Sequence, residues 1–207
     1  ETRSMTLGIA TAAGSAGQII GAPTADALLQ IMPWSSVFLV FAAAIIAVLM
    51  VLPMMRAKQE ITTHQGPDES LSFVIKSAMR DPSYSMIFLG FFSCGFQLAF
   101  VTAHFPAFIT EVCSAIPPNS ILRSIGVNSA SSLGALSIAL IGAANIVGTI
   151  GAGALGKYWS KKYLLALVYT GRTIASIAFI MLPMTPDTVV VFSIVMGSLW
   201  LATVPLT

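Results

Sequence analysis

Five polar side chains interrupt the apolar stretches of this 207-residue sequence: Gln18, Gln97, His104, Asn145 and Arg172. Polar groups in hydrocarbon are costly unless they find partners, so each of them is a candidate for binding a solute or a proton. We find no glycine-rich phosphate loop, metal-ligand spacing or nucleophile signature around them. The sequence therefore predicts a binding site without a catalytic residue, a metal or a cofactor, and not an enzyme.

Arg172 is the candidate with the clearest charge. It lies nine residues after Tyr163, which is about 14 Å along a helix at about 1.5 Å per residue. Insertion of an arginine at the middle of a bilayer costs about 2.5–3.5 kcal/mol, so its guanidinium needs a partner. That partner is either a substrate anion or a structural group, such as a carboxylate or helix carbonyls.

Gln97 and His104 are seven residues apart and would share one face of a helix. A histidine titrates near neutral pH and could carry a proton that is coupled to solute movement, or it could be a packing residue. We expect Pro106 to disturb the helix just beyond and to free carbonyls that can line a cavity.

Asn145 lies in the middle of an apolar segment, where it either binds solute or forms hydrogen bonds between helices. Thr11, Ser15 and Gln18 form a polar stripe nearer the N-terminus, and we expect Gln18 to be the member that contacts the solute. Asp26 follows near the end of the same segment, where we expect it to be solvated.

The elements that carry these residues must lie in a membrane. Hydrophobic residues make up 56% of the sequence and charged residues only 9%, against about 25% charged residues in soluble domains. A net charge of +2 gives no reason to expect nucleic acid as a partner. A spanning helix needs about 20 apolar residues, and six segments qualify: 7–29, 34–55, 84–110, 133–156, 163–183 and 188–207. The predicted fold is an all-α transmembrane bundle.

The basic residues predict the orientation of these spans. Eight would lie on one side of six alternating spans, and only Arg123 on the other. The basic side should be cytoplasmic, which makes the chain a multi-pass protein of the cell membrane. The eight residues are Arg3, Arg56, Lys58, Lys76, Arg80, Lys157, Lys161 and Lys162.

The long polar stretch 56–83 changes character after Ser70. Between Leu71 and Arg80 the apolar residues recur at helical spacing, and Lys76 and Arg80 are one turn apart. This pattern predicts a short amphipathic helix on the cytoplasmic face of the membrane. The alternative is a solvated linker.

Small residues are concentrated in the first segment, where Gly17, Gly21 and Pro23 stand close together. Small side chains allow helix backbones to approach closely in lipid. Tight packing is one consequence, and a bending helix at a moving interface is another.

Two stretches resemble the major facilitator superfamily. The first resembles its fifth helix, with a glycine- and proline-rich signature at the interface between the two halves of the molecule, and the second resembles the short basic loop between helices eight and nine. The first stretch is Arg3-Ser4-Met5-Thr6-Leu7-Gly8-Ile9 followed by Gly14-x2-Gly17-x3-Gly21-Ala22-Pro23. The second stretch is Gly153 to Lys162. The resemblance implies interface or gating roles for Gly17, Gly21, Pro23, Lys157, Lys161 and Lys162. The loop departs from the family pattern, because Lys157 replaces an aspartate and Tyr158 a basic residue.

Further stretches are similar to bacterial members near the monocarboxylate and oxalate–formate branch: 103–108, 141–148 and 200–206. This resemblance implies that the sequence corresponds to helices five to ten of a transporter with twelve helices. Residues 1–55 would end the first six-helix half, 56–83 would form the central cytoplasmic loop, and 84–207 would begin the second half. Asn145 and Thr149 stand where many monocarboxylate carriers have an acid and an arginine, so that mechanism does not transfer directly.

The function implied is secondary transport of a small anionic organic solute by alternating access, with proton coupling, in the bacterial inner membrane. The lipid bilayer and the remaining helices of a full-length chain would be its other partners. The alternative is a non-transporting membrane protein, such as an assembly factor or a membrane enzyme. A membrane enzyme should show acids, histidines or cysteines clustered at one interface, and this sequence shows none.

Overall fold

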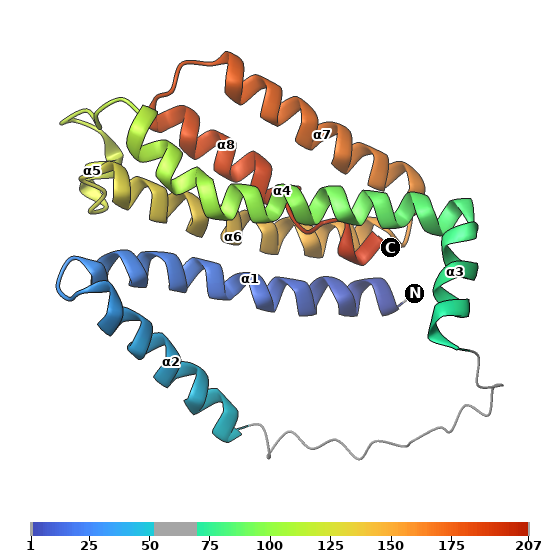
Figure 1. Ribbon diagram of the computed structural model, residues 1–207. Coiled ribbons are helices and arrows are strands. Elements are labelled where there is room, and N and C mark those ends of the chain that lie inside the picture. The colour runs from blue at the N-terminus through green and yellow to red at the C-terminus, as the bar shows by residue number, and fades with distance from the viewer. Residues whose placement is uncertain (1, 52–69, 207) are drawn as a thin grey trace. The chain divides into compact units, whose positions relative to one another are not determined.

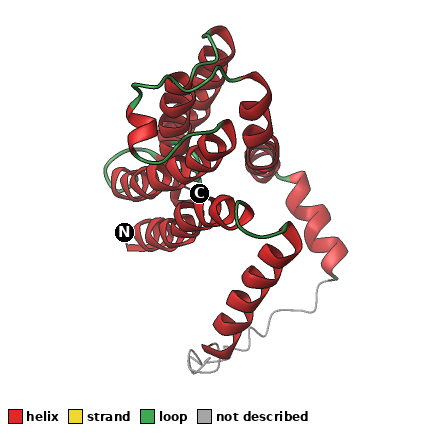
Figure 2. Ribbon diagram, turned by 90° about the vertical axis from the view of Figure 1, so that its left-hand side faces the viewer, coloured by secondary structure: helices red, strands yellow, loops and turns green. Residues whose placement is uncertain are grey.

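The computed structural model describes residues 2–51 and 70–206, and it leaves the side chains of residues 2–4 undescribed. All regular structure in these residues is helical, as Figure 2 shows. The long helices are α1 (Thr2–Leu29), α2 (Trp34–Val51), α4 (Pro82–Val112), α6 (Ala130–Leu155) and α7 (Lys161–Met181), and the shorter ones are α3 (Leu71–Arg80), α5 (Ile121–Ser124), α8 (Pro186–Ser198) and the 3-10 helix η2 (Val204–Leu206). The predicted all-α class is confirmed.

The chain divides into two compact units. One contains Glu1–Ile31 and Val101–Thr207, and the other contains Met32–Phe100. The first unit holds α1, the end of α4, and α5 to η2, which can be followed in Figure 1. The second holds α2, α3 and the beginning of α4.

Among the described residues, α2, α4, α6 and α7 are long and apolar enough to cross a membrane. They correspond to four of the six predicted spans. The first predicted span is also a helix, because α1 has 28 residues, but its many glycines, alanines and hydroxyl side chains keep it outside that group.

The sixth predicted span, 188–207, is wrong as a continuous helix. Helix α8 ends at Ser198 after 13 residues, which is about 20 Å at about 1.5 Å per residue, against a hydrocarbon core of about 30 Å. The chain then turns through Leu199 to Thr203 and forms η2. Thr185 caps the start of α8 through a reciprocal hydrogen-bond pair with Thr188.

The polar stretch after α2 is described only from Ser70 onward, so Arg56 and Lys58 lie outside the described residues. A helix, α3, forms at the predicted place, Leu71–Arg80. Only Asp81 separates it from α4.

Pro106 does not interrupt α4, contrary to our expectation. The helix continues to Val112, and Pro106 packs on Gly134 of α6, where an added Cβ would lie 3.2 Å from the Pro106 Cα. Nearby, Phe105 meets Phe179 of α7 and Phe192 of α8, with ring centroids 5.6 and 5.3 Å away. This part of α4 thus packs against α6, α7 and α8 while it stays helical.

Candidate functional site

Helix α6 is the central element of the first unit and the most deeply buried of the four candidate spans. It packs against α1 on one side and against α8 on another. Both crossings depend on glycine. A Cβ on Gly142 would lie 2.8 Å from the Cβ of Gln18, and one on Gly197 would lie 2.6 Å from the carbonyl oxygen of Ile141. Such contacts bring polar groups on neighbouring helices within hydrogen-bonding range.

Helices α1 and α6 run side by side in opposite directions in Figure 1. Their contacts follow that arrangement: Gly8 near the start of α1 meets the Thr149 carbonyl near the end of α6. Ser15 meets Asn145 in the middle, and Asp26 meets Ser131 at the far end. The two helices therefore pack along most of their length.

Asn145 is the polar centre of this arrangement. Its side chain is fully buried, and its Nδ2 donates to Ser15 Oγ of α1 at 2.5 Å. Its Oδ1 accepts from the backbone N–H of Leu201, in the turn after α8, at 2.8 Å. One carboxamide thus links three segments, as the interhelical interpretation of Asn145 predicted.

Arg172 lies in the middle of α7 and is only 2% exposed. Its Nη2 donates to the carbonyl of Trp200, in the same turn that Asn145 contacts. This partner is a backbone carbonyl, as the sequence allowed, but it lies in the turn after α8 rather than in a helix. Two predicted site residues, Asn145 and Arg172, therefore contact the same turn, which follows α8.

The turn after α8 contains backbone groups to which both side chains bond. A backbone that leaves helical geometry at membrane depth exposes N–H and C=O groups that must find other partners. Asn145 accepts from Leu201 N–H and Arg172 donates to the Trp200 carbonyl. Trp200 itself is 1% exposed, and within the described part of the chain its indole N–H has no hydrogen-bond acceptor.

Gln18 also faces α6, where its side chain lies against Gly142. Its Oε1 is buried, and no donor to it is found among the described residues. Ser15, rather than Gln18, makes the hydrogen bond to Asn145. The polar stripe on α1 was recognisable from the sequence. Which of its residues bonds to Asn145 depends on the register of α1 and α6.

Gln97 and His104 both lie on α4, but they belong to different units. Gln97 is partly buried and His104 is exposed. His104 is therefore not enclosed with Asn145 and Arg172. A role for either residue in solute or proton handling stays a prediction.

The residues expected to gate the molecule do not make its closest helix contacts. A Cβ on Gly17 or Gly21 would meet nothing within 4 Å, and Pro23 is exposed within a helix that continues to Leu29. Lys157, Lys161 and Lys162 are exposed around the turn between α6 and α7. Their gating roles stay predictions.

Asp26 makes contacts with α6 in addition to the solvation that we expected. It is partly buried, and its carboxylate accepts hydrogen bonds from Ser131 Oγ at 2.8 Å and Ser132 Oγ at 3.0 Å. Both serines are in the first turn of α6, where the helix dipole favours a negative charge. An acid near the end of one span and a serine-rich start of another were the signals in the sequence.

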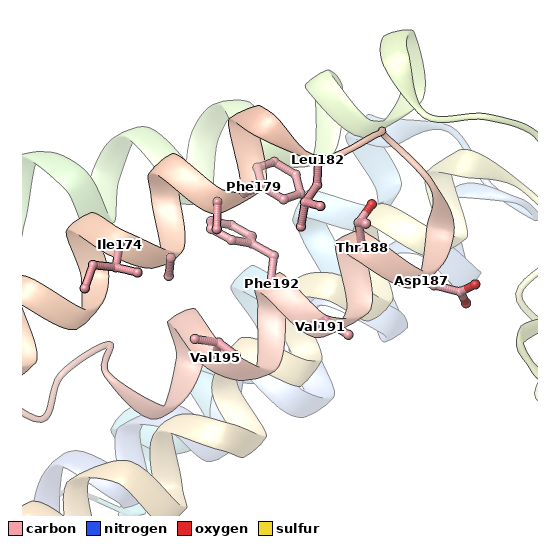
Figure 3. A pocket seen from close by; sticks show the side chains of 10 residues that line it. Ile174, Phe179, Leu182, Asp187, Thr188, Val191, Phe192 and Val195 are labelled. Atoms are coloured by element: carbon pink, nitrogen blue, oxygen red, sulfur yellow. The ribbon is translucent and has the colours of Figure 1, made fainter.

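A separate apolar groove lies between α7 and α8, with a volume of about 440 Å³, shown in Figure 3. Ile174, Phe179, Phe192 and Val195 form much of its wall, and Asp187 and Thr188 supply its polar edge. None of the predicted site residues lines it. Asp187 places an acidic side chain at its edge, which disfavours an anionic solute there.

Fold and site together define a polytopic α-helical membrane protein with buried polar groups at its helix crossings. The family model described as Major Facilitator Superfamily matches residues 1–207. The chain therefore belongs to this superfamily, whose members are membrane transporters rather than enzymes. No curated protein and no solved structure matches the chain significantly.

Proposed function

We propose that this transporter moves a small anionic organic solute by alternating access, coupled to protons, in the bacterial inner membrane. The observation that carries the proposal is Arg172, which brings a positive charge into the interior of the helical bundle with only 2% of its surface exposed. Charged residues at such depth are costly and are characteristic of substrate and ion pathways. The resemblance to the monocarboxylate and oxalate–formate branch supports a carboxylate as the anion.

The proposed architecture assigns α1 and α2 to one six-helix half, and α4, α6, α7 and α8 to the other. In that assignment the α1–α6 contact joins the two halves. Alternating access requires the two ends of such a contact to separate in turn. The hydrogen bonds of Asn145 to Ser15 and of Asp26 to Ser131 are then contacts that form and break during transport.

The test is uptake of radiolabelled small carboxylates by the full-length protein in proteoliposomes, with and without an imposed proton gradient. We expect a gradient to accelerate uptake. Arg172→Gln should raise the KM for the anion, whereas Arg172→Lys should retain part of the affinity because it keeps the charge. Thermal unfolding of each variant separates loss of binding from loss of fold.

His104→Ala should remove the response to the proton gradient while leaving exchange of solute between the two sides of the membrane. Wild-type uptake and wild-type proton dependence in a variant that combines Arg172→Ala with His104→Ala would remove both residues from the mechanism. Uptake of neutral solutes in preference to carboxylates would reject the anionic substrate.

A further inference from the structure

Helix α3 presents one apolar and one basic side, and both are largely uncovered. Leu71 is 76% exposed and Ile75 54% exposed, and Val74 and Met79 extend the same apolar side. Lys76 and the other residues of the opposite side are exposed as well. An amphipathic helix of this kind is stable when its apolar side is buried in a membrane interface.

The junction of α3 with α4 fixes the direction of the short helix. The Asp81 carboxylate accepts from the N–H of Ser83 at 2.8 Å at the start of α4. The Ser85 hydroxyl donates to the Met79 carbonyl at 2.8 Å. Figure 1 shows α3 running crosswise to the adjoining part of α4. If α4 crosses the membrane, as its length and composition allow, a helix crosswise to its first turns would lie along the membrane surface.

The basic side of α3 contains a hollow of about 220 Å³, lined by Phe73, Lys76, Ser77 and Arg80. Two cations and a hydroxyl converge there, which is the chemistry that binds a phosphate group. Long basic side chains can also keep their stems on apolar surface while their charged ends reach the headgroups.

We propose that α3 lies flat in the membrane interface and that Lys76 and Arg80 bind the phosphate groups of anionic phospholipids. The apolar side formed by Leu71, Val74, Ile75 and Met79 enters the acyl region. The lipid contact of α4 thus continues onto α3, and the surface charge of the bilayer helps to hold the helix in place.

The experiment uses spin labels on the full-length protein in lipid vesicles, in a background with Cys94→Ser and Cys113→Ser. One label is attached at Ile75→Cys on the apolar side, and its matched control at Ser77→Cys on the basic side. Collision rates with molecular oxygen report the membrane, and those with a water-soluble nickel chelate report water. Vesicles of phosphatidylcholine alone are compared with vesicles that also contain phosphatidylglycerol.

We expect the label at position 75 to collide mainly with oxygen, and the label at position 77 mainly with nickel. Phosphatidylglycerol should lower the nickel collisions at position 75. The combined Lys76→Gln and Arg80→Gln variant should lose this lipid-dependent shift, whereas Lys76→Arg with Arg80→Lys should keep it.

Equal nickel collisions at both positions would place α3 in water and overturn the proposal. Protection of position 75 from both reagents would overturn it in favour of packing on protein. An unchanged shift in the glutamine variant would show that the two cations do not bind the lipid. Each of these results leaves the transport proposal untouched.

Discussion

Asn145 and Arg172 each form a hydrogen bond with a backbone group that has no partner within a helix. The turn after α8 leaves the Leu201 N–H and the Trp200 carbonyl without helical partners, and these two side chains supply them. Their polarity and their central positions in the apolar segments were readable from the sequence. Their shared destination was not, because it depends on where α8 ends.

Asn145→Ala is expected to lower the free energy of unfolding by about 1–3 kcal/mol, because a buried N–H loses its acceptor. Ser15→Ala removes one of the same hydrogen bonds, so the combined variant should lose less than the two single losses added together. Reversible unfolding in mixed detergents, followed by circular dichroism, measures this cycle.

Thr173→Ala is the matched control for this cycle, since its exposed hydroxyl bonds to the Tyr169 carbonyl one turn earlier on the same helix. It should leave the free energy of unfolding nearly unchanged. Strictly additive losses at Ser15 and Asn145 would contradict the hydrogen bond between them.

At the scale of elements, long apolar runs were sufficient to predict α2, α4, α6 and α7 as candidate spans. The early end of α8 was not predictable, since the nearest proline, Pro205, comes well after Ser198. Similarly, Pro106 suggested a disturbed helix, yet α4 continues to Val112, with Pro106 packed on Gly134 and the neighbouring Phe105 packed on Phe179 and Phe192. In both places the backbone is accompanied by tertiary contacts that the local sequence does not reveal.

The close contact of α6 with α8 predicts opposite effects on stability for substitutions at two glycines of α6, Gly148 and Gly151. A Cβ on Gly148 would overlap the carbonyl of Ser198, whereas one on Gly151 would meet nothing within 4 Å. Gly148→Ala should therefore lower the free energy of unfolding by about 1–3 kcal/mol through overpacking. Gly151→Ala should raise it slightly, because alanine favours helix by up to about 1 kcal/mol over glycine.

The measurement is again detergent-induced unfolding, with the apparent melting temperature as a second readout. Equal effects of the two substitutions would show that α8 does not approach α6 at Gly148. Loss of stability at Gly151 alone would reverse the assignment of the two faces.

At the scale of the whole molecule, the loops that follow α4, α6 and α7 bear on the two sides that the basic residues predict. The turn after α6 carries Lys157, Lys161 and Lys162, while Cys113 follows the C-terminal end of α4. The Ser114 N–H bonds to the Met184 carbonyl in the loop between α7 and α8. The basic residues could predict two sides of the membrane. Only the packing shows that the loop after α4 and the loop between α7 and α8 lie together on one side.

Membrane orientation can be tested with Cys113. We expect an impermeant maleimide to label Cys113 from outside intact cells, whereas a cysteine at the highly exposed Tyr158 should be labelled only after the membrane is opened. Burial raises the pKa of the Cys113 thiol, so a smaller fraction is thiolate at neutral pH. Because the thiolate is the reacting form, labelling of Cys113 should accelerate as the pH rises above the ordinary range for cysteine.

Cys94 is only 5% exposed and should contribute little to the signal, and Cys113→Ser supplies the background. Labelling of Cys113 and of Tyr158→Cys from the same side would contradict the arrangement of α6 as a single span between them. Labelling of both with their sides exchanged would keep the fold but invert the orientation that the basic residues predict. The two outcomes differ, so the experiment tests the span and its direction separately.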